Sequence, residues 1–215
     1  MTENYVSAHF AGISRFNGTD FFYLKRTLKM FLFCAAGLAA GIVLASLFPC
    51  SETELKALGN AHFCTFFDGL SAIRCVKNAV RFALADMLSV IITAFFGFTM
   101  LACGCSAVML IFRGAQFGYC FCSLLPLSHM MTGGARALAL FALAKLLILA
   151  ALVFAASEAE GFSYFFRDSY GKRPRTLKGI IPLRYAVMSA STAGFTVLVN
   201  TLYLLFIHFQ DISML

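Results

Sequence analysis

The sequence predicts an all-α membrane protein, a polytopic bundle of about five transmembrane helices joined by short interfacial amphipathic helices. Three observations lead to this fold class. Of the 215 residues, 60% are hydrophobic and only 13% are charged, whereas soluble domains carry about 25% charged residues. Uncharged stretches recur that are long enough to cross a hydrocarbon core about 30 Å thick. These stretches are apolar on every face, without alternation, which excludes the strands of a transmembrane barrel.

Five segments qualify as spans of a single membrane domain that covers residues 1–215. Four of them are free of charged residues, and the other is interrupted once, by Lys145. Because peptide groups in lipid must be hydrogen-bonded within the chain, each segment is expected to be a helix. The spans are expected at about 30–49, 87–111, 114–131, 137–156 and 185–208.

The distribution of Lys and Arg predicts the orientation, because the cytoplasmic flanks of membrane helices are enriched in both. With the N-terminus inside, residues 1–29, Arg113 and residues 157–184 hold eleven Lys and Arg, against five in the outer segments. We therefore expect a multi-pass protein of the cell membrane, with a cytoplasmic N-terminus, a first span retained as a signal anchor, and an extracytoplasmic C-terminus. This topology also accounts for the net charge of +7, so nucleic acid is not expected as a partner.

The segments between the spans have patterns of their own. Residues 51–81 carry apolar side chains at helical spacing, which predicts an extracytoplasmic amphipathic segment that opens with a capping box of Ser51 and Glu54. This segment either lies on the outer face of the bundle or forms a platform for an external partner. Residues 157–184 are expected to form a basic cytoplasmic loop whose aromatic cluster anchors at the membrane surface. A short interfacial helix near the N-terminus is expected to end at Gly18.

Residues suited to catalysis or metal binding are few. No catalytic motif, pair of intramembrane carboxylates or phosphate-binding loop is present, so neither an enzyme activity nor a cofactor is expected. The two CxC pairs, which begin at Cys103 and Cys120, point apart on a helix, so no metal site is expected either. Cys50, Cys64 and Cys75 fall on the outer side, where two of them could form a disulfide or all could stay reduced.

Lys145 is the one charge placed deep within a predicted span, where an isolated charge costs roughly 2.5–3.5 kcal/mol. It either extends to an interface or makes a polar contact with another helix or a partner protein. Small residues four apart, at Gly37 and Gly41 and again at Gly114 and Gly118, favour close helix packing, and the sequence allows a homo-oligomer. The candidate helix-packing or partner-interface residues are Arg113, Gly114, Gly118 and Lys145.

A local signature stands in the passage MLIFRGAQFGYCFCSLL, residues 109–125, where an apolar helix stops at a basic residue and Gly. This passage resembles the stage II sporulation protein M family, in which a second span runs into a basic-Gly step followed by a Gly-Phe-rich third span. Arg113 and Gly114 match the step, and Gly118 and Tyr119 match the Gly-aromatic pair after it. The order of a basic start, one span, an outer segment and four further spans agrees as well.

The resemblance implies a role in endospore formation. It suggests a non-enzymatic scaffold that recruits and positions peptidoglycan hydrolases, of the amidase or endopeptidase and lytic transglycosylase types, for engulfment. Membrane lipids would be the other partners. The alternative belongs to a different class, a small-solute transporter or permease subunit, which the buried charge of Lys145 and a helix break at Arg113 would favour.

Overall fold

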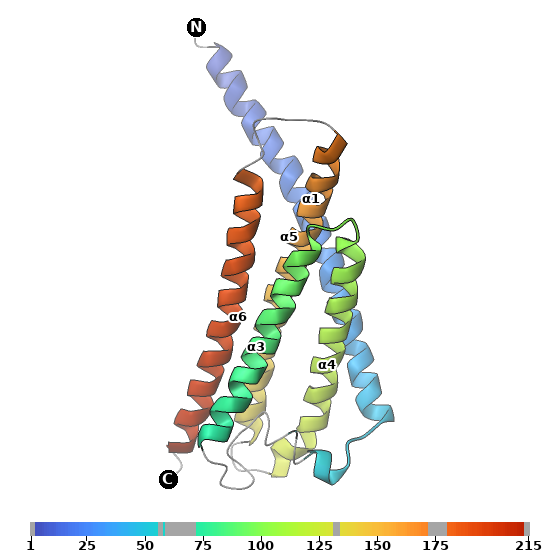
Figure 1. Ribbon diagram of the computed structural model, residues 1–215, viewed down its shortest axis with the longest axis vertical. Helices are drawn as coiled ribbons and strands as arrows, with labels where there is room; N and C mark the ends of the chain where they lie inside the picture. The colour runs from blue at the N-terminus through green and yellow to red at the C-terminus, as the bar shows by residue number, and fades with distance from the viewer. Residues whose placement is uncertain (1–2, 56–57, 59–71, 131–133, 172–179, 213–215) are drawn as a thin grey trace.

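The computed structural model describes residues 3–55, 58, 72–130, 134–171 and 180–212, and this part of the chain contains helices and no strand (Figure 1). Its long helices are α1 (Glu3–Leu47), α3 (Ala72–Phe96), α4 (Ala102–Met130), α5 (Gly134–Gly171) and α6 (Ile180–Ile212). Successive long helices run in opposite directions, so α1 begins and α6 ends at opposite ends of the bundle (Figure 1). The predicted all-α helix bundle is confirmed.

The bundle is organised around α5, which touches each of the other four long helices. α1 packs along α4, and α3 packs along α6, whereas α3 and α4 touch each other little. About half of the core side chains therefore come from α5, namely Ala137, Leu138, Phe141, Ala144, Ile148, Leu149, Leu152, Val153, Ala155 and Ala156.

Within the described residues, four helices are long and apolar enough to cross a bilayer. These segments are Tyr23–Leu47 in α1, Ala102–Pro126 in α4, Gly134–Tyr164 in α5 and Leu183–Phe206 in α6. Large apolar side chains, such as Phe95 and Phe112, are more than half exposed on the outer faces, which lipid tolerates and water does not. α3 has 25 residues, about 37 Å of helix. That length is sufficient for the fifth span, which stays a prediction.

The turn between the second and third long helices does not lie where the sequence predicts it. The predicted spans 87–111 and 114–131, with a break at Arg113, are wrong. The chain turns instead at residues 97–101, where backbone N–H groups donate to carbonyls three residues earlier. Arg113 lies inside the continuous helix α4, because its guanidinium group finds hydrogen-bond acceptors on α3 and need not reach water.

Two further predicted helix ends are wrong. α1 continues through Gly18, since one glycine inside a helix costs only about 1 kcal/mol. The predicted loop 157–184 is largely helical, because α5 runs far beyond Ser157, whose hydroxyl lies 3.0 Å from the hydroxyl of Thr27 on α1. Phe162 belongs to the aromatic cluster expected at the membrane surface, but it is buried and stacks on Tyr185 with ring centroids 4.3 Å apart.

The predicted amphipathic segment 51–81 is described only in part. Residues 52–55 form a helical turn, and residues 72–81 belong to α3 rather than to a separate amphipathic helix. Residues 56–57 and 59–71 lie outside the described residues. The platform expected in this segment therefore stays a prediction.

α1 and α4 approach each other backbone to backbone at four glycines. These are Gly37 and Gly41 on α1 and Gly114 and Gly118 on α4. A Cβ atom built on any of the four would collide with the backbone of the opposite helix. The two small-residue repeats seen in the sequence are thus the two sides of a single interface, held by close packing of the helices.

Candidate functional site

A buried ion pair joins α3 to α5 inside the bundle. The Lys145 Nζ atom donates to the Asp86 Oδ2 atom at 2.7 Å, and the two side chains are 15% and 9% exposed. Of the two options for Lys145, extension to an interface is therefore wrong, and a polar contact with another helix is confirmed. Lys145 also lies 5.7 Å from the centre of the Phe82 ring, a further favourable contact for a cation.

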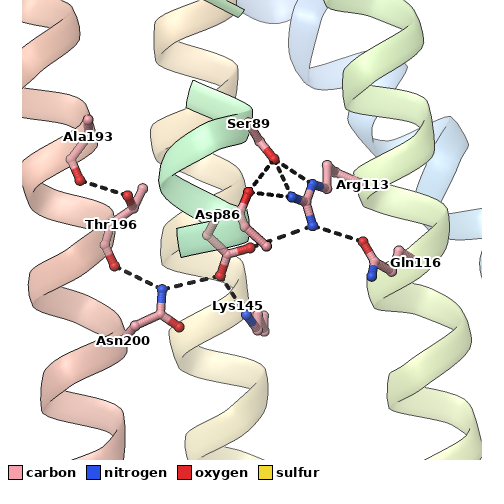
Figure 2. Close-up of polar contacts among 9 residues, drawn as sticks. Asp86, Ser89, Arg113, Gln116, Lys145, Ala193, Thr196 and Asn200 are labelled. Carbon is pink, nitrogen blue, oxygen red and sulfur yellow. Dashed lines mark hydrogen bonds and ion pairs between the residues drawn. The ribbon is translucent and has the colours of Figure 1, made fainter. Parts of the chain in front are cut away.

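Arg113 brings α4 into the same cluster (Figure 2). Its guanidinium nitrogens donate to the Ser89 hydroxyl, with Nε at 2.8 Å, to the Ala85 carbonyl at 2.6 Å, and to the Gln116 side-chain oxygen at 2.9 Å. Its Nη1 atom lies 3.7 Å from Asp86 Oδ1. Arg113 therefore binds α3 through both backbone and side chain.

Asn200 adds α6 to the cluster. Its amide nitrogen donates to Asp86 Oδ2 at 3.2 Å and to the Thr196 carbonyl of its own helix at 2.9 Å. Asp86 consequently accepts hydrogen bonds from Lys145 and Asn200 and forms an ion pair with Arg113, so it contacts three different helices (Figure 2). We call Asp86, Ser89, Arg113, Lys145 and Asn200 the charge cluster.

The charge cluster lies deep along the helices. Arg113 is near the middle of the apolar segment Ala102–Pro126, with at least about 16 Å of helix on either side at 1.5 Å per residue. Neither end of the bilayer is within easy reach of its guanidinium group. Solvation of these charges must come from within the bundle, which the hydrogen bonds of the charge cluster provide.

A cavity of about 60 Å³ adjoins the charge cluster between α3, α4 and α5. That volume has room for roughly four water molecules. One side of its wall is polar, formed by Asp86, Ser89, Arg113, Gln116 and Lys145, and the rest is lined by Phe82, Val90, Phe117, Cys120, Phe141, Ile148, Leu149 and Leu152.

A second ion pair ties α1 to α5 near the 97–101 turn. Lys29 Nζ donates to Glu160 Oε1 at 2.6 Å; the lysine side chain is 41% exposed, whereas that of the glutamate is 3% exposed. The other carboxylate oxygen of Glu160 is buried and has no hydrogen-bond partner in the part of the chain that the structure describes. This pair holds the long extension of α5 against α1.

A helix cap formed by Ser51 and Glu54 lies at the opposite end of the bundle. The carboxylate of Glu54 accepts from the backbone N–H of Ser51 at 2.9 Å, and the Ser51 hydroxyl accepts from the N–H of Glu54 at 3.4 Å. The predicted capping box is confirmed. The backbone N–H of Ser51, followed by its hydroxyl, lowers the pKa of the exposed Glu54 carboxyl.

The cysteines offer no metal centre within the described residues, where no group of three His, Cys, Asp or Glu side chains gathers. Cys50 is a free thiol, 3.2 Å from the hydroxyl of Tyr119. Cys64 and the side chain of Cys75 lie outside the described residues, so the choice between a disulfide and reduced thiols stays a prediction.

The four candidate residues fall into two sites. Arg113 and Lys145 meet in the charge cluster, whereas Gly114 and Gly118 face α1. Asp86, Ser89 and Asn200 are not among the candidate residues predicted from the sequence, and Asp86 directly precedes the predicted span 87–111. Asn200 stands inside an uncharged run, in which an amide is a recognisable signal because polar groups in lipid need partners.

Comparison with protein-family models, with curated proteins and with solved structures finds no match to this chain. Its function must be inferred from the residues and their arrangement.

Proposed function

We propose that the protein is a non-enzymatic membrane scaffold, similar in role to stage II sporulation protein M, that recruits and positions peptidoglycan hydrolases during engulfment in endospore formation. The proposal rests on the resemblance of residues 109–125 and on the character of the charge cluster. The hydrolases, of the amidase or endopeptidase and lytic transglycosylase types, would supply the chemistry.

The observation that favours a scaffold over a transporter is the hydrogen bonding of the charge cluster across four helices, beside a small cavity. Arg113 and Lys145 both point at Asp86, and α3 supplies further acceptors for the guanidinium. Sites for small molecules are usually about 300–1,000 Å³, whereas this cavity is about 60 Å³. A cluster of this kind fixes four helices in one arrangement, as a rigid platform requires.

The proposed orientation puts the N-terminus in the cytoplasm and the C-terminus outside the cell membrane. With Arg113 inside α4, residues 1–29 and 157–184 still hold ten Lys and Arg, against five in the outer segments. That asymmetry favours the same orientation. It puts the α5–α6 connection inside and residues 51–71 outside.

The extracytoplasmic end is the proposed docking surface for the hydrolases. There, Leu55 and Leu58 pack against the core of the bundle, while Glu54 and its cap remain exposed. A segment anchored in this way would present its polar side to a partner at a fixed height above the membrane.

Affinity purification from native membranes tests the scaffold. The tagged wild-type protein is compared with two variants in which a Gly/Ser sequence of equal length replaces either residues 59–71, proposed outside, or residues 172–179, proposed inside. Wild type and the 172–179 variant should retain wall hydrolases, and the 59–71 variant should lose them and block engulfment. Absence of hydrolases from the wild-type sample, together with normal engulfment after gene deletion, would exclude the scaffold.

A small-solute transporter remains the second candidate, favoured by one observation, the polar cavity deep within the spans. Alternating access would have to open this cavity to both sides. Solute flux in reconstituted vesicles that disappears in a folded Lys145→Leu variant would favour the transporter over the scaffold.

A further inference from the structure

The formal charges around the cavity do not balance. Arg113 and Lys145 are cationic and share the single carboxylate of Asp86. No second Asp or Glu lines the cavity among the residues that the structure describes. The cavity and its polar wall therefore carry a formal charge of +1, surrounded by apolar side chains.

An unbalanced charge at this depth is costly. Lys145 and Arg113 are 15% and 18% exposed, so water screens them weakly. A single carboxylate can offset only one of the two charges, and a lone cation in the middle of a bilayer costs roughly 2.5–3.5 kcal/mol or more. A bound negative charge would remove that cost.

Two donor groups remain available at the cavity. The ammonium group of Lys145 has three protons, of which the contact with Asp86 uses one. The side-chain nitrogen of Gln116 has no hydrogen-bond partner within the described residues, since only the oxygen of this amide is engaged, by Arg113. Gln116 lines the cavity and is exposed there.

We propose that this cavity binds one small monovalent anion, of halide or formate size, held by Lys145 and the Gln116 amide in the positive field of Arg113. Figure 2 shows Arg113 and Lys145 both directed at Asp86, and the anion balances the positive charge that this single carboxylate leaves uncompensated. Its size is limited by a volume with room for roughly four water molecules. This site is independent of the proposed scaffold role, which neither requires nor excludes it.

Thermal unfolding at constant ionic strength tests the site. Full-length protein in detergent is melted in sodium gluconate, whose anion is too large for the cavity, and in mixtures where chloride, bromide or formate replaces gluconate. A ligand that binds only the folded state gives a saturable rise, here expected to be about 3 °C or more. A response to halides alone identifies a halide site, and a response to formate as well identifies a site that also takes carboxylates. Equal melting in all four anions contradicts the proposal.

Two substitutions at one position locate the binding. Gln116→Glu puts a carboxylate beside Arg113. In gluconate, the melting temperature of this variant should equal that of the wild type at saturating chloride, and added chloride should not raise it further. Gln116→Leu lacks the amide but keeps the excess charge, so it should retain a weakened response. An undiminished chloride response in Gln116→Glu overturns the assignment.

A direct measurement covers the case in which Gln116→Glu does not fold. Bound chloride broadens the ³⁵Cl resonance, and bromide should compete for the same site. Lys145→Met removes the excess charge while Asp86 keeps Arg113, so the broadening seen with wild type should be lost. Broadening that is absent from wild type, or unchanged in Lys145→Met, refutes the site.

Discussion

Asp86 on α3 and Lys145 on α5 form a 2.7 Å ion pair inside the bundle, 59 positions apart in the sequence. Each of them alone would be an expensive charge in a bilayer, and together they link two helices. Arg113 and Asn200 contact the same carboxylate. One acidic side chain thereby holds three other helices in register with its own.

Replacing Asp86 should therefore destabilise the protein strongly. Asp86→Asn leaves two buried cations without a counter-charge, and we expect a loss of about 3–5 kcal/mol in unfolding free energy, measured in detergent. The double variant Asp86→Asn/Lys145→Met removes one of those cations and should recover part of the loss. A loss below about 1 kcal/mol in the single variant would mean that the pair contributes little.

The α1–α4 interface should tolerate no added methyl group. Gly118→Ala forces the two backbones apart, because its Cβ meets the backbone of Leu38 and Ile42, and overpacking of this kind costs about 1–3 kcal/mol. Gly104→Ala is the matched control on the same helix, since nothing lies within 4 Å of its added Cβ. It should leave stability unchanged or raise it by up to about 1 kcal/mol. Equal melting temperatures for the two variants would contradict the interface.

Loss of Lys29 should lower the free energy of unfolding more than loss of Glu160 does. Lys29→Met leaves the carboxylate of Glu160 buried and unpaired, at a cost of about 2–3 kcal/mol. Glu160→Gln leaves a lysine that is 41% exposed and can turn to solvent, so its cost should stay below about 1 kcal/mol. Unfolding in denaturant measures both, and the reverse order would show that the burial of Glu160 is misassigned.

The helix cap at residues 51–54 should weaken in acid. The folded-state pKa of Glu54 is below its ordinary value of 4.5, so its stabilisation is fully present above that value and is lost as the pH falls through the lowered pKa. Amide hydrogen exchange at Ser51 should therefore lose protection below about pH 4.5. Glu54→Gln has no carboxylate to titrate, and protection at Ser51 in this variant should not change over the same pH range.

Asp86 and Arg113 show which parts of this fold can be predicted from the sequence and which cannot. Uncharged runs identify the apolar helices and the bundle, because hydrocarbon thickness sets their length. The same criterion ends a span at every charge, so Asp86 and Arg113 both fall just outside the predicted spans 87–111 and 114–131. In the structure both lie within helices, because the negative charge of Asp86 and the positive charge of Arg113 offset each other there. Pairing across the bundle depends on packing, which no single run of sequence contains.

The glycines also show that the sequence does not reveal which helices pack together. Their spacing predicts that Gly37 and Gly114 each lie on a face suited to close contact, but not that these two faces meet. Only the arrangement of α1 beside α4 identifies them as partners. Gly104 has nothing within 4 Å of an added Cβ, and neither Gly104 nor Gly18 ends its helix.

The central claim is that the bundle spans the membrane with its two ends on opposite sides, and site-directed labelling tests it most directly. In a cysteine-free background, Met100→Cys marks the exposed 97–101 turn, and Ser213→Cys marks the C-terminus. A membrane-impermeant maleimide should label Ser213→Cys in intact cells and Met100→Cys only after permeabilisation. Labelling of both from outside, or of Met100→Cys alone, would contradict the account.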